Sequence, residues 1–478
     1  MTSLLRKFLL MSMAALLSAC AMGPDYERPE VPVPDAWEGS DAAGRSIATL
    51  DWWDVFRDQR MVELIETALQ NNRDLAIAMA QIEEARASLG FVRADQFPNL
   101  DGGAGAARGT TVLGPDSINE SFVLAASLSF EIDLWGKLRR STEAARATLL
   151  STVEARNVVT ITLIADVASY YLLLLDLDQR VAIAARTVDT RQDSLGIIQA
   201  RFDKGTVPLI DVNQAQIELA DAVAELASLE RERDHAENAL SILLGRNPGP
   251  LERSSFELKD TVHIPDIPAG LPSELLERRP DIRGASQDLA AQTARIGVAE
   301  ALRFPSLSLT GTLGLASNEL DNFISSDNKS WGLSADVLGP IIDAGRGKAR
   351  VEAEIARAEQ LQAAYELTVM RAFQEVEDTL VSIDTYGREA NAREMQVTAA
   401  RSAATLSRAR YDGGVTSYLE VLESERSLFR AELQALATRR AQVVSIVTLY
   451  KALGGGWPTA EEIEAAGSFM EAALPKEP

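Results

Sequence analysis

The segment RFDKGTVPLIDV occupies residues 201–212, and a near copy, RYDGGVTSYLEV, occupies residues 410–421. Both open with arginine, an aromatic residue and aspartate, contain a glycine, and close with an acidic residue followed by valine. Other pairs recur in the same order at an offset of about 210 residues, which indicates an internal repeat. They are RADQFPNL at 93–100 with EALRFPSL at 300–307, NRDLAIA at 72–78 with RPDIRGA at 279–285, and LLGRNP at 243–248 with ALGGGWP at 452–458.

The composition argues against an enzyme and against a nucleic-acid partner. The 478 residues are 46% hydrophobic and carry a net charge of −23, so nucleic-acid phosphates repel the chain. The two histidines, His235 and His263, are far apart, and Cys20 is the single cysteine, so we expect no metal site. Because no glycine-rich phosphate loop and no nucleophile–histidine–acid set is recognisable, we expect neither catalysis nor a cofactor.

Residues 1–19 have the features of an export signal, because basic residues precede an apolar run that ends in small residues. The sequence LSAC at 17–20 resembles the lipobox of bacterial lipoproteins, which implies cleavage before Cys20 and lipidation of its thiol. An ordinary signal peptide with an incidental cysteine is the alternative. Residues 20–58 are rich in proline at their start, so we predict an extended arm that holds the lipid anchor away from the folded body.

The spacing of prolines predicts unusually long helices. No proline lies between Pro115 and Pro208 or between Pro340 and Pro458, and interior proline normally breaks a helix. Apolar residues in the second stretch recur at alternating spacings of four and three, the period of coiled-coil packing. We predict helices at 73–95, 137–203 and 208–244 in the first repeat (59–250), helices at 280–302, 345–411 and 416–452 in the second repeat (273–458), a linker at 251–272 and a tail at 459–478.

A β-hairpin is predicted within each repeat, at 99–132 and at 306–338. Residues 121–132 alternate strictly between apolar side chains and mostly polar ones, and the segments 110–120 and 316–330 are predicted to be loops. This period fits either a soluble sheet or the strands of a membrane barrel. An open sheet of four strands cannot sit in lipid, and membrane barrels have at least eight strands. The export signal therefore favours an oligomer that pools strands from several chains.

The sequence resembles the TolC-like outer membrane factors, in particular the NodT-type efflux outer-membrane lipoproteins. The resemblance rests on LSACAMGPDYERP after the signal, FEIDLWGK at 130–137, ERRPDIRGA at 277–285, the two FP-to-strand junctions and both arginine–aromatic turns. It implies an α+β membrane protein in which three chains form one 12-stranded transmembrane β-barrel, with four strands per chain. That barrel is continuous with a long α-helical barrel in the periplasm.

The resemblance also implies the function and the partners. The chain is expected to be a homotrimeric exit duct in the outer membrane, anchored by lipid and extending into the periplasm. Small solutes such as drugs would reach it passively from an inner-membrane pump of the resistance-nodulation-division type, through a periplasmic adaptor protein. The duct of a type I protein secretion system is one alternative. A lipid-anchored coiled-coil structural protein is another, but it leaves the two amphipathic hairpins unexplained.

The repeated turns are interpreted as the periplasmic tip, where the adaptor docks and the duct closes. Gly205 and Gly414 suit helix ends that need a left-handed residue. The expected docking turns are Gly205, Thr206 and Val207 in the first repeat and Gly414, Val415 and Thr416 in the second. Thr416 stands where some relatives carry an arginine.

The resemblance also implies a gate just beyond the turns, where family members carry acidic residues that point into the tunnel. Glu420 and Glu423 lie three residues apart and therefore share a face of the last helix, where three chains would make two acidic rings. Asp211 and Tyr411 are candidates for a hydrogen bond that holds the tip shut. Acidic residues in a first helical turn also complement the helix dipole, which is the alternative role for both glutamates.

Overall fold

The computed structural model describes residues 21–34, 37, 58–111, 114–254, 272 and 275–455. The chain forms two compact units, each assembled from three stretches of sequence. The predicted export signal, Cys20 and the predicted tail lie outside the described residues. Unit 1 comprises residues 1–31, 79–154 and 282–368, and unit 2 comprises residues 32–78, 155–281 and 369–478.

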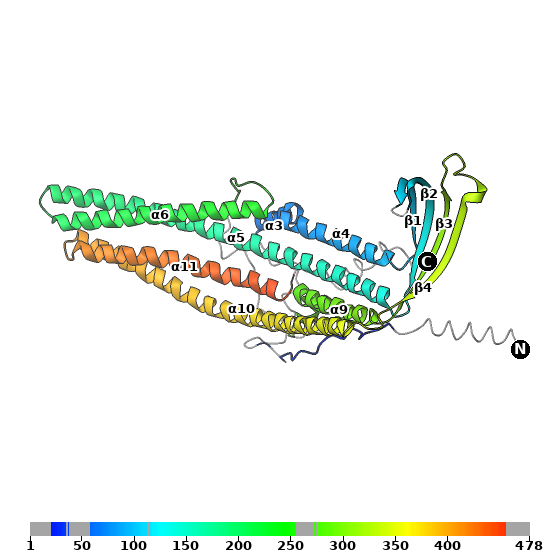
Figure 1. Ribbon diagram of the computed structural model, residues 1–478. Coiled ribbons are helices and arrows are strands. Elements are labelled where there is room, and N and C mark those ends of the chain that lie inside the picture. Colours follow the sequence, from blue (N-terminus) through cyan, green and yellow to red (C-terminus); the bar gives the residue numbers. More distant parts are fainter. Residues whose placement is uncertain are drawn as a thin grey trace. The chain divides into compact units, whose positions relative to one another are not determined.

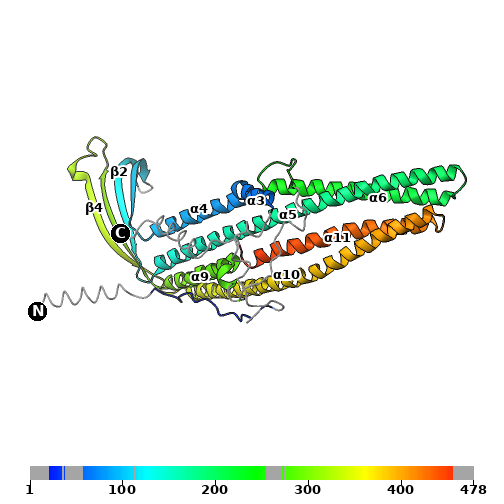
Figure 2. The same cartoon turned by 180° about the vertical axis from the view of Figure 1, so that it is seen from behind.

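Unit 1 contains one antiparallel sheet in which four strands are adjacent in chain order (Figures 1 and 2). The two predicted hairpins are confirmed, and the second strand of the first hairpin pairs with the first strand of the second. The alternation is confirmed as well, because the register sets Leu124 opposite Leu315 and Ser127 opposite Thr312. The strands are β1 (Asn99–Thr111), β2 (Gly114–Ile132), β3 (Ser306–Ser317) and β4 (Lys329–Leu338).

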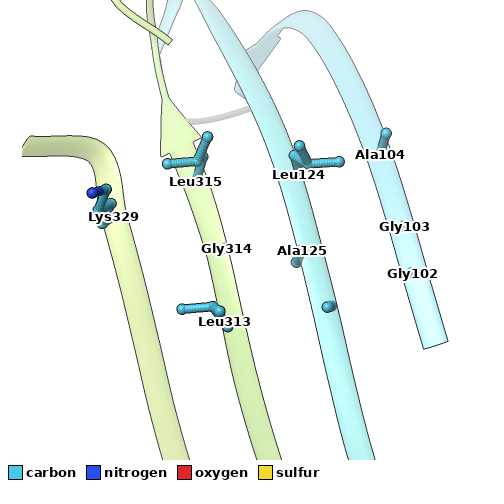
Figure 3. A pocket seen from close by; sticks show the side chains of 10 residues that line it. Gly102, Gly103, Ala104, Leu124, Ala125, Leu313, Gly314, Leu315 and Lys329 are labelled. Atoms are coloured by element: carbon cyan, nitrogen blue, oxygen red, sulfur yellow. The ribbon is translucent and has the colours of Figure 1, made fainter. Parts of the chain in front are cut away.

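The leucine-bearing face of the sheet has a shallow hollow where small residues replace larger ones. Gly102, Ala104 and Ala126 leave a space of about 590 Å³ between the leucine side chains, with Lys329 at its rim (Figure 3). Nearly all of its lining is therefore apolar. This face suits contact with an apolar phase rather than with water.

The predicted loop at 110–120 is wrong in its extent, because β2 already begins at Gly114 and β1 continues to Thr111. The composition of this segment is typical of a loop, but strand pairing overrides it: the ladder continues with Arg108 opposite Glu120. An ion pair between these two side chains (3.2 Å) crosses the hairpin there. The second loop is closer to its prediction, and a short 3₁₀ helix, η3 (Ser326–Asn328), lies within it.

The helices repeat as the sequence predicts. Both long helices have 67 residues and both returning helices have 35. Among the described helices, α5 is long and apolar enough to cross a membrane, but more than half of its most apolar part is buried inside the protein, as in a packed core helix. The helices are α4 (Arg73–Ala94), α5 (Lys137–Asp203) and α6 (Leu209–Leu243) in the first repeat, and α9 (Pro280–Ala301), α10 (Arg346–Asp412) and α11 (Tyr418–Ala452) in the second.

A joint connects the end of each returning helix to the start of the helix that leads to the strands. In the first repeat Asn72 donates from Nδ2 to the carbonyl oxygen of Leu243 (2.9 Å) and accepts from the N–H of Leu75 (3.0 Å). In the second repeat Arg279 donates to the carbonyl oxygen of Ala452 (2.8 Å) and pairs with Asp281 (2.6 Å). At each joint, one side chain therefore bonds a carbonyl oxygen at the end of the returning helix and a group in the first turn of the next helix.

Two helices were not predicted, α3 (Gln59–Asn71) and the four-residue α8 (Leu275–Arg278). The signal for α3 is present, because its buried residues recur at helical spacing and its N-cap is an aspartate, Asp58, that accepts from the N–H of Arg60 (2.9 Å). The apolar residues of α3 that are buried are Met61, Leu64, Ile65 and Ala68.

The N-cap residue Asp58 also belongs to a buried polar network. The hydroxyl of Tyr171, a fully buried residue of α5, donates to Asp58 Oδ2 (3.1 Å) and accepts from the N–H of Ser254 (3.1 Å). The hydroxyl of Ser254 donates to the same carboxylate oxygen (2.5 Å). Burial raises the pKa of the Tyr171 hydroxyl, so it remains a donor. The network ties α3, α5 and the start of the predicted linker together.

The arm does not stand away from the body as predicted. Its residues pack against unit 1: the Tyr26 hydroxyl is 2.8 Å from the hydroxyl of Ser286 on α9, and Arg28 Nε donates to the hydroxyl of Tyr365 on α10 (3.0 Å). Prolines exclude a helix from this segment, but they do not prevent an extended chain from docking on helices. The prediction of extended backbone is confirmed for residues 21–34, the part of the arm that the structure describes without a gap, and the expectation that the arm lies apart from the body is wrong there.

Removing one hydroxyl should show what the Asp58 network contributes. We expect Tyr171→Phe to lower the free energy of unfolding by about 1–3 kcal/mol, because a buried carboxylate and a backbone N–H each lose a partner. Tyr170→Phe is the matched control, since Tyr170 is adjacent and partly exposed. Thermal unfolding of the purified protein in detergent would measure both, and equal midpoints for the two variants would contradict the assigned role.

Candidate gate and docking tip

Both repeats end their long helix with the same backbone motif. Gly205 and Gly414 have φ angles of 72° and 70°, in the left-handed region that glycine enters without steric cost. The N–H of Gly205 donates to the carbonyl oxygen of Phe202 (2.7 Å), and the N–H of Thr206 donates to that of Arg201 (3.0 Å). This is the Schellman arrangement, and the second turn reproduces it with Gly414 to Tyr411 and Val415 to Arg410, both at 2.9 Å.

The predicted docking residues lie in these two turns. The hydroxyl of Thr206 donates to the carbonyl oxygen of Arg201 (2.8 Å) and so reinforces the first turn. Val207 is partly buried and packs against the apolar cluster of the tip, whereas 71% of Val415 is exposed. The two turns therefore share a backbone and differ in the side chain that they offer to solvent.

The returning helices begin without a side-chain cap. Their N-cap residues are Pro208 and Ser417, and neither side chain bonds the first turn of its helix. The first turns carry Asp211 and Glu420, whose negative charges complement the positive end of the helix dipole. Their backbone N–H groups donate to the carbonyl oxygens of Pro208 (3.1 Å) and Ser417 (3.2 Å).

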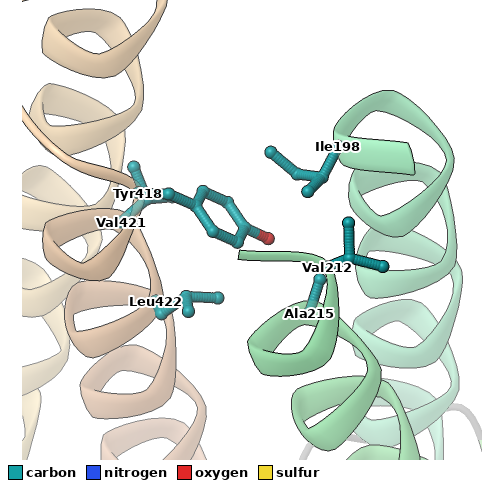
Figure 4. Close-up of a cluster of buried hydrophobic side chains, with 6 residues drawn as sticks. All are labelled: Ile198, Val212, Ala215, Tyr418, Val421 and Leu422. Atoms are coloured by element: carbon teal, nitrogen blue, oxygen red, sulfur yellow. The ribbon is translucent and has the colours of Figure 1, made fainter. Parts of the chain in front are cut away.

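An apolar cluster joins the two helical hairpins of the tip. Tyr418 from the start of α11 points between α5 and α6, where it meets Ile198 and Val212 (Figure 4). Burial raises the pKa of the Tyr418 hydroxyl to about 12, so this group is neutral at physiological pH. The buried members of this tip cluster are Ile198, Val212, Ala215, Tyr418, Val421 and Leu422.

Tyr411 packs at the edge of the tip cluster, with its ring 5.4 Å from that of Tyr418 and with the guanidinium of Arg201 lying 5.0 Å from its ring centroid. Its hydroxyl is buried and has no hydrogen-bond partner among the described residues. Within one chain the structure does not bring Tyr411 and Asp211 into the hydrogen bond that we predicted. The hairpins are linked here by apolar packing, by the cation–π contact of Arg201 and by an ion pair between Arg201 and Asp412 (3.6 Å).

The two predicted gate glutamates lie at the surface of the tip, and each has a basic neighbour. Glu420 accepts a hydrogen bond from the Thr416 hydroxyl and lies 3.4 Å from Arg410 Nε. Glu423 lies 3.3 Å from the guanidinium of Arg426. Thr416 thus contacts the carboxylate directly, while Arg410 supplies a positive charge. Exposed ion pairs of this kind are worth roughly 0–1 kcal/mol, so they do not immobilise the carboxylates.

A buried charged layer lies beyond the predicted gate residues, and it was not predicted from the sequence. Glu218 on α6 is 3% exposed and pairs with Arg191 on α5 (3.1 Å). Arg426 on α11 donates from Nε to the same carboxylate (3.1 Å) while it also reaches Glu423. Arg426 therefore connects the buried Glu218 of the first hairpin to Glu423, a predicted gate residue, of the second. Removal of one partner from such a buried pair typically costs about 3–5 kcal/mol.

A second polar bridge crosses between the hairpins at the same level. Arg408 on α10 donates to the hydroxyl of Ser194 on α5 (2.9 Å) and lies 3.5 Å from Glu425 on α11. Burial raises the pKa of Glu425, against the lowering effect of Arg408 and Arg191.

The spacing of the buried residues Val212, Ala215, Glu218 and Ala222 places Glu218 on the apolar seam of α6, and that signal was available in the sequence.

Comparison with known proteins places these features in a family. The model of the outer membrane efflux protein family matches residues 64–246 and 271–455, one match for each repeat. Outer membrane protein OprJ of Pseudomonas aeruginosa is 35% identical over 93% of this chain and 94% of its own length. The toluene efflux pump outer membrane protein TtgI of Pseudomonas putida is 36% identical over 95% of this chain and 100% of its own length.

Solved structures agree with these sequence matches. A crystal structure of CusC covers 91% of this chain and 100% of its own with a TM-score of 0.83 and 32% identity. The open state of the MtrE outer membrane channel of Neisseria gonorrhoeae covers 91% of this chain and 98% of its own with a TM-score of 0.82 and 32% identity. The chain belongs to the outer membrane efflux protein family, and it is an outer-membrane exit duct of a tripartite efflux system, as the resemblance implied.

Two adjacent glycines allow a matched test of the second turn. An added Cβ at Gly414 meets no atom within 4 Å, so Gly414→Ala acts only through its φ of 70° and should destabilise the turn by about 1–2 kcal/mol. Gly413→Ala is the control, because Gly413 does not have a positive φ. Its added Cβ would lie 3.4 Å from the carbonyl oxygen of Ala409, which is an ordinary van der Waals contact.

Thermal unfolding and drug susceptibility of cells that carry each variant would measure the two effects. We expect Gly414→Ala to lower both the unfolding midpoint and the drug resistance, and Gly413→Ala to change neither. Equal behaviour of the two variants would show that the left-handed residue is not required.

Proposed function

We propose that three copies of this chain form one 12-stranded transmembrane β-barrel, continuous with a periplasmic barrel of α-helices, and that small solutes leave the cell through it. The observation that carries the proposal is the four-stranded sheet with an apolar face and with β1 and β4 at its edges. Unpaired strand edges are not tolerated in lipid, so the edge strands need partners from further copies. Three copies supply 12 strands, above the minimum of eight for a membrane barrel.

The partners follow from the same proposal. An inner-membrane pump of the resistance-nodulation-division type would deliver the solute, and a periplasmic adaptor would dock on the two turns of each chain. Exposed apolar side chains at the turns, Val415, Ile210 and Leu419, support a docking role. TtgI serves a toluene pump and CusC a cation efflux system, so the proposal names small solutes as a class rather than one compound.

The lipid anchor is part of the proposal. Cys20 would carry the lipid after removal of residues 1–19, in keeping with its position directly before the described arm. The anchor would hold the chain at the inner face of the outer membrane, and the helices would extend into the periplasm.

A gene deletion with complementation tests the efflux function. We expect loss of this chain to increase the sensitivity of the cells to members of a panel of antibiotics, metals and bile salts, and the wild-type gene to restore resistance. The purified protein should run as a heat-sensitive trimer band on a denaturing gel, because closed barrels resist detergent until heated. An unchanged panel together with a monomeric band would refute the proposal.

The gate assignment makes a separate prediction. In the trimer, Glu420 and Glu423 would form two acidic rings near the narrow end, which favour cations over anions. We expect Glu420→Gln combined with Glu423→Gln to reduce cation selectivity in planar-bilayer recordings while trimers form normally. If Glu420, the one of the two in the first turn of α11, merely complements the helix dipole, the double substitution should reduce stability by about 0.3–1 kcal/mol and leave selectivity at the wild-type value.

A further inference from the structure

The two faces of the four-stranded sheet differ in chemistry. Directly opposite residues of antiparallel strands share a face, so the register assigns each side chain to one of the two. One face carries Ser127 of β2 opposite Thr312 of β3, and the other carries Leu124 opposite Leu315. In the proposed barrel the polar face lines the interior, and the leucine-bearing face therefore meets lipid.

Small residues interrupt the leucine-bearing face and leave the hollow already described. Gly102 of β1 lies opposite Ala126 of β2, and Ala104 lies opposite Leu124. A Cβ atom on Gly102 would meet no atom within 4 Å, so the backbone is uncovered there. The leucine side chains of β2 and β3 form the walls, among them Leu313. The hollow of about 590 Å³ has the size of a small-molecule pocket, roughly 300–1,000 Å³.

A basic side chain stands at the rim of the hollow. Lys329 is the first residue of β4 and lies opposite Leu315, so it belongs to the leucine-bearing face (Figure 3). The other basic residue in the four strands, Arg108, is paired with Glu120 (3.2 Å). The exposed ammonium group of Lys329 has no ion-pair partner in the part of the chain that the structure describes. A cation on a lipid-facing surface is costly unless an anion pairs with it.

The place of Lys329 along β4 corresponds to a membrane boundary. Val337, near the other end of β4, lies on the same face. The strand between them rises ~27 Å, or ~20 Å along the membrane normal at a tilt of about 40°. The apolar band of a membrane barrel is about 25 Å tall, so Lys329 lies at its edge. Trp331 is adjacent on this face and 77% exposed, as in the aromatic girdles of such barrels.

The boundary at Lys329 is the outer one. The last residues of β2 and β4 lead into the long helices α5 and α10, which extend into the periplasm in the proposed assembly. Lys329 is at the opposite end of β4, directly after the loop that contains η3. Its charge therefore lies at the level of the head groups of the outer leaflet, while the hollow lies at the level of the acyl chains.

We propose that the hollow binds an acyl chain of an outer-leaflet lipid whose head-group phosphate pairs with Lys329. The apolar floor offers no partner to a free phosphate ion, and the unpaired lysine favours an anionic head group over an uncharged one. A phosphorylated glycolipid of the lipid A type supplies both the acyl chains and the phosphate. This inference rests on the proposed barrel, because it requires the leucine-bearing face to lie in lipid.

The test measures binding of lipid A, with and without its phosphates, to the full-length protein in non-ionic detergent by native mass spectrometry. Gly102→Leu fills the hollow, and Gly105→Leu is its matched control. Gly105 is on the same strand, opposite Val123 and therefore on the other face, and its added Cβ also meets no atom within 4 Å. Lys329→Gln removes the charge and Lys329→Arg keeps it. Lys348→Gln, at an exposed residue of α10, is the control for charge.

We expect Lys329→Gln to weaken binding of lipid A about fivefold and Gly102→Leu about tenfold, while Lys329→Arg and both controls match wild type. Removal of the phosphates should weaken binding to wild type by the same factor as Lys329→Gln and should not weaken binding to that variant further.

Wild-type affinity in both Lys329→Gln and Gly102→Leu would overturn the site, and equal affinity of wild type for the two forms of lipid A would overturn the role of Lys329. Loss of trimers in Gly102→Leu but not in Gly105→Leu, with lipid binding unchanged, would show that a neighbouring copy fills the hollow instead. Failure of the proposed function is distinguishable, because wild type and the controls would then also lack heat-sensitive trimers.

Discussion

Four helix ends in this chain depend on a glycine in the left-handed conformation, and the rest of the architecture follows from them. Gly205 and Gly414 reverse the chain after the long helices, while Gly245 and Gly454, with φ of 71° each, stop the returning helices. The four glycines do not have the same requirement for space. A Cβ atom would meet no neighbour at either tip, but at Gly245 it would lie 2.2 Å from the carbonyl oxygen of Asn71. The tips therefore require a backbone conformation alone, whereas the joint of the first repeat also requires the absence of a side chain.

The two repeats solve the same problem at the joint with different chemistry. Asn72 is neutral and bonds backbone groups of the two helix ends, whereas Arg279 adds an ion pair with Glu375 of the long helix α10 (2.8 Å). Buried charges also lie where the two repeats meet in unit 2: Asp176 of α5 pairs with Arg440 of α11, and Glu218 of α6 pairs with Arg426. Such pairs contribute little net stability in comparison with apolar residues, but an unpaired partner is costly, so they favour one register of the helices. Ion pairs thus favour one arrangement of the helices of the first repeat against those of the second.

The helices and strands could be predicted from the sequence where a long, regular pattern specified each of them. Proline-free stretches predicted α5 and α10, and the alternation at 121–132 predicted which residues of β2 share a face. The errors occurred where the local composition indicates one structure and contact with a distant segment imposes another. Residues 114–120 have the composition of a loop and form strand because β1 is there to pair with them. Proline predicted extended backbone in the arm but could not reveal its packing against Arg140 and Gly297, residues far away in the chain. In the candidate site, the repeated turns located the glycines and the two glutamates at the tip. The spacing on α6 marked Glu218 as a buried residue, but its pairing with Arg191 and Arg426 could not be predicted because those residues come from two other helices.

The docked arm has a consequence for the order of folding. The arm is among the first segments of the chain to be synthesised, whereas its partners are synthesised much later. The partner of Asp25, Arg140, lies 115 positions further along the chain. Ser286 lies 260 positions after Tyr26, and Tyr365 lies 337 positions after Arg28. Contacts this distant in sequence form slowly, because long loops must close before they are rewarded. The arm can therefore complete its contacts only when α9 and α10, which carry Ser286 and Tyr365, are in place.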